Sequence, residues 1–272
     1  MLNTTAEKAW ANIGLDHVSH SQLSKPLPNF LFEYVYLNSR RKDMRPNCNM
    51  FCGTLAHDYI QAVAAKKQPL AAALKDARRQ LSLYAPRDEA DAKLKDQSLE
   101  QIGDVVENGV GVTRELVIKN PEIERKITFE LEGVAVPVLG YVDLIWENNF
   151  LEIKTKWRKK DGGAAPMPKV PSFNHTLQCA IYWKATGLHP RLLYVRDMNC
   201  VLFDSNNCES LTTENMERLL EYARQIAIQR QNLLRISTDF DFLKTIIPAD
   251  WESMYWNIDP EYLVEAKNIW KL

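Results

Sequence analysis

The spacing of hydrophobic residues changes along the chain and separates a helical first part from a strand-rich middle. Over the first hundred residues, apolar side chains recur at helical spacing, and glycine and β-branched residues are scarce. Segment 70–83 is rich in helix-forming residues. In segment 50–65, Leu55, Tyr59 and Val63 share one helical face. We therefore expect a helix over each of these two segments.

Short runs of β-branched and aromatic residues begin at about Lys126. Gly133, Pro137 and the pair Asn148–Asn149 interrupt these runs. The segment 157–171 that follows is too rich in glycine and proline to favour regular structure. We expect three strands before it, over residues 127–131, 136–146 and 150–155.

Helical spacing returns after this segment. Ser172 is a suitable N-cap and Gly187 a suitable C-terminal stop for the helix between them. Two further strands are predicted over residues 192–195 and 201–203, and a long helix over 213–234. The predicted order of helix, three strands, helix, two strands and helix is typical of an α/β fold.

The composition is that of an ordinary globular protein of 272 residues. Lys and Arg number 34 against 35 Asp and Glu, so the net charge of −1 argues against a globally basic nucleic-acid coat. The chain has no run of about 18 apolar residues, so we expect no membrane span. Five irregularly spaced cysteines argue against a disulfide framework and favour a reducing, cytoplasmic compartment.

The segment 140–156 carries the most informative charged residues. If Asn148–Asn149 forms a two-residue hairpin turn, Asp143 lies opposite Lys154, and Glu152 is two residues from Lys154 on the same strand. Opposed residues point to the same face of an antiparallel pair, as do residues two apart on one strand. The two acids and the lysine are therefore predicted to converge, while the residues between them are mostly apolar and suit a buried face.

Two carboxylates one diagonal step apart, about 7–8 Å between Cα atoms, can bind the same divalent cation. The cation would lower the pKa of a bound water, and the Lys154 ammonium would hold a phosphate oxygen or orient the attacking hydroxide. An ordinary solvent-exposed hairpin face is the alternative interpretation. A three-residue turn would instead scatter the charged residues over both faces.

Gly140-x-x-Asp143 followed by Glu152-x-Lys154 resembles the PD-(D/E)xK nuclease superfamily. Val142 stands where the name of the superfamily has proline, and the Gly-x-x-Asp form looks like the RecB-type exonuclease branch.

Two further segments resemble the same branch. Gly53–His57 is similar to its upstream helix, in which a histidine supplies a metal ligand, and Gln178-x-x-x-Tyr182 is similar to its Q-x-x-x-Y motif. The i, i+4 spacing places Gln178 and Tyr182 on one helix face. The resemblance covers about residues 50–203.

The resemblance implies a restriction-endonuclease-like α/β core, in which helices flank a central mixed β-sheet. We assign residues 46–210 to this core, with a helical insertion at about 68–105. Residues 1–45 would form an N-terminal helical extension, and residues 211–272 a C-terminal helical region packed on the core.

The resemblance also implies a site that holds Mg²⁺ or Mn²⁺. Lys154 would position the nucleophile or the phosphate, and Gln178 with Tyr182 would organise the site and contact the substrate. The residues assigned to catalysis are Asp143, Glu152, Lys154, Gln178 and Tyr182, and those assigned to the metal are His57, Asp143, Glu152 and the carbonyl of Ile153.

The activity that the resemblance implies is hydrolysis of phosphodiester bonds in linear single- or double-stranded DNA, from an end. The setting would be DNA recombination, repair or replication in a bacterial or phage-infected cytosol, or in the mitochondrial matrix, with a recombination or replication protein as partner. Two alternatives stay open: a catalytically silent DNA-binding or assembly subunit, and a sequence-specific endonuclease.

Two local basic runs would add contacts to DNA phosphates. One contains Arg40 and Arg41, and the other contains Trp157, whose ring could stack on an unpaired base. A solvated helix end and loop would account for both runs equally well. The residues assigned to substrate binding are Arg40, Arg41, Lys156, Trp157, Arg158, Lys159 and Lys160.

Three acidic residues before the hairpin, Glu107, Glu130 and Glu132, are weaker candidates for an additional metal ligand. Glu130 is the best of them, although a solvent-facing carboxylate is the favoured interpretation.

Some RecB-type relatives hold an iron–sulfur cluster with one cysteine before the histidine helix and a close group of three near the C-terminus. This chain has no cysteine after Cys208, so the resemblance does not extend to a cluster at Cys48 and Cys52, which are expected to be small buried residues. Aromatic residues near the C-terminus are expected to pack in a core, with a stacking surface for nucleic acid as the alternative.

Overall fold

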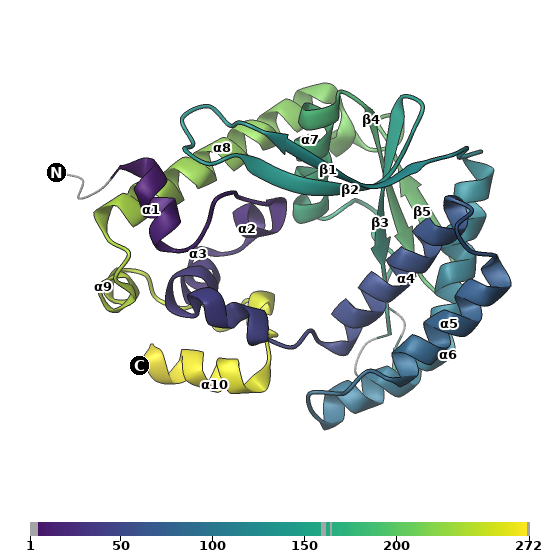
Figure 1. Ribbon diagram of the computed structural model, residues 1–272, viewed down its shortest axis with the longest axis horizontal. Helices are drawn as coiled ribbons and strands as arrows, with labels where there is room; N and C mark the ends of the chain where they lie inside the picture. Colours follow the sequence, from purple (N-terminus) through teal and green to yellow (C-terminus); the bar gives the residue numbers. More distant parts are fainter. Residues whose placement is uncertain (1–4, 159–161, 164, 271–272) are drawn as a thin grey trace. The chain divides into compact units, whose positions relative to one another are not determined.

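The computed structural model describes residues 5–158, 162–163 and 165–270 (Figure 1). The chain forms two compact units. The central unit comprises Pro46–Ile127 and Tyr141–Met216, and the terminal unit comprises Met1–Arg45, Thr128–Gly140 and Glu217–Leu272.

A five-stranded mixed sheet runs in the order β1-β2-β3-β4-β5. The β2–β3 and β4–β5 pairs are antiparallel, and β3–β4 is parallel. The chain is therefore α/β, with helices flanking a mixed sheet, as the sequence predicts. The strands are β1 (Glu122–Phe129), β2 (Val138–Trp146), β3 (Asn149–Thr155), β4 (His189–Val195) and β5 (Cys200–Phe203).

The helices of the central unit lie close to their predicted positions. Helix α7 begins after its N-cap Ser172 and ends at Gly187, whose φ of 71° is the left-handed conformation that glycine adopts readily. Both predicted ends of this helix are confirmed. The helices are α4 (Cys48–Ala64), α5 (Leu70–Ser82), α6 (Glu89–Glu115) and α7 (Phe173–Thr186), with the short η3 (Glu209–Leu211) and the start of α8 (Thr213–Ile236).

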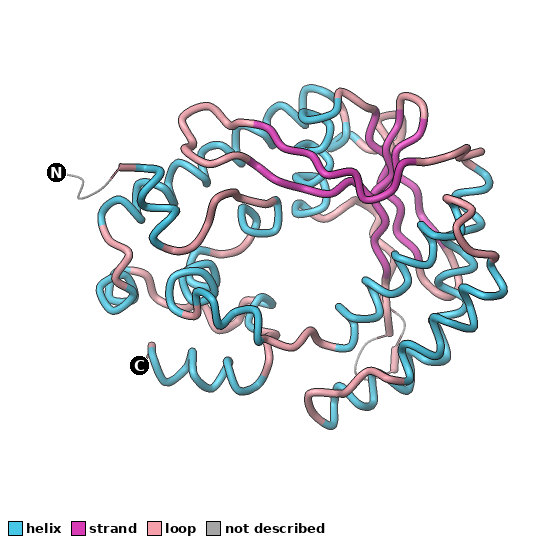
Figure 2. Tube along the Cα trace, viewed as in Figure 1, coloured by secondary structure: helices cyan, strands magenta, loops and turns pink. Residues whose placement is uncertain are grey.

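Helices α4, α5 and α6 pack on one another and cover one face of the sheet (Figures 1 and 2). Leu144, Leu151 and Ile153 point into this core, which confirms that the residues between the predicted site residues are buried. Helix α7 connects the parallel strands β3 and β4 and packs against β4. A parallel pair requires such a crossover, so the hairpin carries helices on both faces.

The terminal unit is built from short helices and the greater part of α8. Its aromatic residues pack on one another, with Trp270 in contact with the rings of Phe32, Phe240 and Trp256. Core packing is thus confirmed for Trp256 and Trp270, which are buried, whereas Trp251 and Tyr255 are half-buried. The elements are α1 (Ala6–Asn12), α2 (His20–Ser24), α3 (Leu27–Phe30), η1 (Leu31–Tyr36), η2 (Asn38–Asp43), α9 (Phe240–Ile246), η4 (Met254–Trp256) and α10 (Pro260–Ile269).

The sequence sets residues 1–45 and 211–272 apart as two additions, whereas the structure groups the segments 1–45 and 217–272 in this one unit. Arg45 Nε, for example, lies 3.0 Å from Oδ2 of Asp259. Among the helices of the described chain, none combines the length and the apolar character needed to cross a bilayer.

Candidate metal centre

The turn between β2 and β3 lies one residue earlier than predicted. Trp146 pairs with Asn149, so the turn residues are Glu147 and Asn148, and Glu147 has a φ of 47°. Asn149 belongs to β3 and not to the turn, because it also pairs with His189 of β4. The predicted turn at Asn148–Asn149 is therefore wrong.

The corrected register still brings the charged residues of the hairpin together. The pairs Leu144–Leu151 and Ile145–Phe150 place Asp143 directly opposite Glu152, two residues from its predicted partner Lys154. Residues two apart on a strand share a face, so the grouping survives the shift. The backbone amide of Asp143 lies 3.5 Å from Oε1 of Glu152, and Lys154 Nζ lies 3.3 Å from Oε2.

These side chains are buried rather than spread over an exposed strand face. Glu152 is 0% exposed and Asp143 6%. The backbone amide of Ile153 donates a 2.7 Å hydrogen bond to Oδ2 of Asp143, which fixes the orientation of that carboxylate. Ile153 thus reaches the site through its main chain, and the role predicted for its carbonyl remains a prediction.

Helix α4 brings His57 to the same place. Its Nε2 lies 2.7 Å from Oδ2 of Asp143, and its side chain is 19% exposed. Gly53, one turn earlier, lies close to the sheet, because a Cβ built there would be 3.3 Å from Oγ1 of Thr155. Gly53 therefore lets the helix approach the sheet closely, and His57 directs its imidazole toward Asp143.

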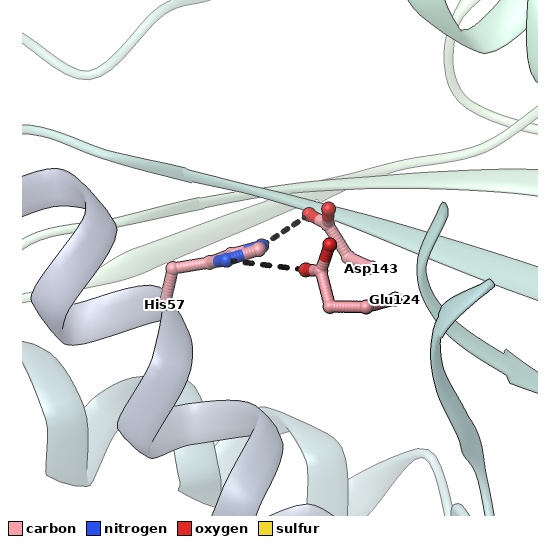
Figure 3. A group of neighbouring side chains, drawn as sticks. All are labelled: His57, Glu124 and Asp143. Atoms are coloured by element: carbon pink, nitrogen blue, oxygen red, sulfur yellow. Dashed lines mark ion pairs between the residues drawn. The ribbon is translucent and has the colours of Figure 1, made fainter. Parts of the chain in front are cut away.

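Strand β1 contributes Glu124, a residue that the sequence did not indicate. Its Oε1 lies 3.8 Å from Nδ1 of His57, and Figure 3 shows its carboxylate beside that of Asp143, facing the same imidazole. Glu124 has a φ of 50°, a backbone conformation that is uncommon for a residue other than glycine. Its side chain is 47% exposed.

His57, Glu124 and Asp143 form a group, here called the metal trio, that could hold a metal ion. One ligand atom from each residue lies within 4.8 Å of the others. Ligands on opposite sides of a Mg²⁺ ion are about 4.2 Å apart, so the trio needs little movement to close on a cation. Glu152 lies beside this trio and would need to turn from Lys154 to join it.

The charges at the centre are strongly coupled. Burial alone would lower the pKa of His57, but the negative charge and hydrogen bond of Asp143 raise it to about 9. Burial, and then the Asp143 charge, raise the pKa of Glu152 to about 8. Burial would lower the pKa of Lys154, but the charges of Glu152 and Asp143 raise it above its usual value. The site thus places two cationic groups, His57 and Lys154, beside the acidic side chains of Asp143 and Glu152.

Gln178 and Tyr182 lie together on α7, as their spacing predicts. Gln178 Nε2 donates to the Tyr182 hydroxyl at 3.0 Å, and the Tyr141 amide of β2 donates to the same oxygen at 3.3 Å. Both side chains are buried, and Oε1 of Gln178 has no hydrogen-bond partner among the described atoms. The pair connects α7 to the strand that carries Asp143.

The basic segment after β3 differs from its predicted role. Trp157 is 6% exposed, packs in the central core and donates to Oγ1 of Thr155 at 2.9 Å. It continues the face of β3 that points into the core, so its ring is not presented for base stacking. Lys156 Nζ lies over the ring of Tyr194, 5.4 Å from its centroid, and burial lowers its pKa.

Of the other residues assigned to substrate binding, Arg158 and Arg40 form ion pairs, and Arg41 lies over an aromatic ring. Arg158 forms ion pairs with Glu100 at 3.0 Å and with Asp197 at 3.7 Å. In the terminal unit, Arg40 pairs with a carboxylate and Arg41 lies over the ring of Tyr34. Lys159 and Lys160 lie outside the described residues.

The three upstream acids, Glu107, Glu130 and Glu132, are exposed and do not belong to the metal trio. Cys48 and Cys52 are buried one turn apart in α4, with their sulfur atoms 3.7 Å from each other.

Comparison with known proteins adds little to this geometry. No protein-family model and no curated protein matches the chain. A solved structure described as "Crystal structure of SSO0001" is 17% identical and aligns with 56% of this chain and 83% of its own, at a TM-score of 0.29. A likeness at that score carries no argument about fold or function.

Proposed function

We propose that this protein is a metal-dependent DNA exonuclease of the PD-(D/E)xK type, with a restriction-endonuclease-like core resembling the RecB branch. The observation that carries the proposal is the chain of contacts from His57 through Asp143 and Glu152 to Lys154. Four residues that the motif assigns to one site meet within hydrogen-bonding distances, although they come from α4, β2 and β3.

The donor atoms suit Mg²⁺ or Mn²⁺. Carboxylate oxygens are the ligands that both ions prefer, and Mn²⁺ also accepts an imidazole nitrogen. A bound ion of this kind lowers the pKa of a coordinated water and offsets negative charge on a phosphate. His57 must release its proton to act as a ligand, and Asp143 is already oriented by the Ile153 amide.

Lys154 has the clearest role among the side chains that do not bind the ion. Its ammonium carries positive charge next to the carboxyl group of Glu152, and the side chain is 21% exposed, so it can meet a phosphate oxygen or an attacking water. Gln178 and Tyr182 support β2 from α7, and the unpaired Oε1 of Gln178 is an acceptor available to a bound group.

The primary test is digestion of linear DNA by the purified protein with Mn²⁺. We expect degradation that a chelator abolishes, and a loss of at least about 100-fold in rate in Asp143→Asn and in Lys154→Met. The controls are Glu107→Gln and Lys67→Met, which change exposed residues of the same unit. Full activity in both site variants, or activity that survives chelation, would contradict the proposal.

End-labelled single- and double-stranded oligonucleotides, compared with a closed circle, separate the alternatives. An exonuclease releases nucleotides from the linear substrates and leaves the circle intact. Cutting of the circle at fixed positions would instead indicate a sequence-specific endonuclease. DNA binding without cleavage, together with no heat of Mn²⁺ binding, would indicate a silent subunit. Only the exonuclease result would support a role in DNA recombination, repair or replication, with a protein partner from that pathway.

A further inference from the structure

Gln61 is a buried amide beside the metal trio. It is 2% exposed and follows His57 by four residues in α4, so both side chains point to the same side of the helix. Its Nε2 donates to Oε1 of Glu124 at 2.7 Å. A buried primary amide is tolerated only when it makes its hydrogen bonds, so this contact is a specific feature of the site.

The short contact of Gln61 is with Glu124 rather than with His57. The amide nitrogen lies 3.5 Å from Nδ1 of His57 and 3.3 Å from Nε2. Because these distances are nearly equal, the amide does not select either ring nitrogen as its acceptor. It packs against the imidazole and directs its hydrogen bond to the carboxylate.

Glu124 needs such a partner more than the other two members of the trio. Asp143 is buried and held by the Ile153 amide, whereas the Glu124 side chain is 47% exposed. It also stands on β1, at one edge of the sheet, where the backbone has a φ of 50°. A half-exposed glutamate samples several rotamers unless a contact selects one.

We propose that Gln61 is a positioning residue that holds the Glu124 carboxylate in place for a divalent cation at the metal trio. This inference rests on the metal site of the proposed function but does not require that the protein cleave DNA. Groups that orient metal ligands in this way typically change metal affinity by about 10- to 100-fold when they are removed.

The test is a double-variant cycle read by calorimetric titration with Mn²⁺. Gln61→Met removes the amide at nearly constant volume and should weaken Mn²⁺ binding about tenfold. In a Glu124→Ala background, the same substitution should change the affinity less than about twofold, because the group that Gln61 positions is already gone. Gln61→Asn keeps an amide but shortens it by one carbon, and should resemble Gln61→Met.

Gln101→Met is the matched control. Gln101 is also a buried glutamine of the central unit, and its Nε2 donates to Oδ2 of Asp197 at 2.6 Å. It should lose stability without a change in Mn²⁺ affinity. Circular dichroism establishes that each variant is folded.

Three results would overturn the inference. They are an unchanged affinity in Gln61→Met and Gln61→Asn, an equal loss with and without Glu124, and no Mn²⁺ binding by the unsubstituted protein. Cleavage assays test the proposed function separately, because coupled losses of Mn²⁺ affinity would establish the positioning role even in a protein that does not digest DNA.

Discussion

The backbone amide of Asp143 faces Oε1 of Glu152 across the β2–β3 pair, at 3.5 Å. The register of the two strands makes these acids neighbours, and the contact itself runs from the main chain of Asp143 to the side chain of Glu152. Two buried acids so close together are unfavourable without nearby positive charge. His57 and Lys154 supply that charge here.

We expect Mn²⁺ to stabilise the fold. A ligand that binds only the folded state at a hundred times its Kd adds about 2.7 kcal/mol to the free energy of unfolding. Thermal unfolding with Mn²⁺ and with a chelator measures the shift in Tm. Asp143→Asn should abolish the shift, because Asp143 belongs both to the metal trio and to the predicted ligand set. Glu107→Gln should retain it, and an equal shift in both variants would place the cation elsewhere.

Tyr182→Phe should lower the free energy of unfolding by about 1–2 kcal/mol. The substitution leaves a buried donor, Gln178 Nε2, and a partly buried one, the Tyr141 amide, without their acceptor. Urea denaturation followed by circular dichroism measures the loss. Adding Gln178→Met removes one of those donors, so the double variant should lose less than the sum of the two single losses. Additive losses would show that the two side chains act independently.

The faces of the hairpin could be predicted although its turn could not. Both registers place Asp143, Glu152 and Lys154 on one side, because the partner of Asp143 moves by an even number of residues along β3. The turn itself depends on a long-range contact, the pairing of Asn149 with β4, which no local preference of asparagine reveals. The order of helices and strands was likewise predictable from periodicity and from residues such as Gly187.

Glu124 and Gln61 could not be found in the same way. Glu124 adopts a positive φ, a conformation that sequence signals through glycine or asparagine rather than through glutamate. It also precedes the predicted start of β1. The i, i+4 spacing of His57 and Gln61 was present in the sequence, but such a pair is common on ordinary helices.

The buried carboxylate of Asp91 should make the protein sensitive to acid. Oδ1 accepts from the Cys48 amide at 2.8 Å, and Oδ2 accepts from the Tyr84 hydroxyl at 2.5 Å and from the Arg87 amide at 3.0 Å. Burial would raise the pKa of Asp91, but the hydrogen bonds from Tyr84, Arg87 and Cys48 lower it below its usual value.

A lowered pKa means that the folded state binds this proton less readily than the unfolded state. The stabilisation is fully present above the unfolded pKa of about 3.9 and is lost as the pH falls through the lower pKa of the folded state. Asp91→Asn should flatten this acid dependence and should cost about 1–3 kcal/mol near pH 7. Urea titrations between about pH 2 and 7 measure both effects. Asp96→Asn, on an exposed position of the same helix, should keep the acid dependence.

Trp157 should matter for stability and not for DNA binding. Its ring is buried in the core formed by α4, α5, α6 and one face of the sheet, and its indole nitrogen donates to Thr155. Trp157→Ala should therefore lower the free energy of unfolding by about 3–5 kcal/mol. Trp157→Phe keeps most of the apolar contact, so it should remain folded and bind labelled single-stranded DNA as the unsubstituted protein does. Fluorescence anisotropy measures that affinity, and a loss of several-fold in the folded Phe variant would show that the indole reaches DNA after all.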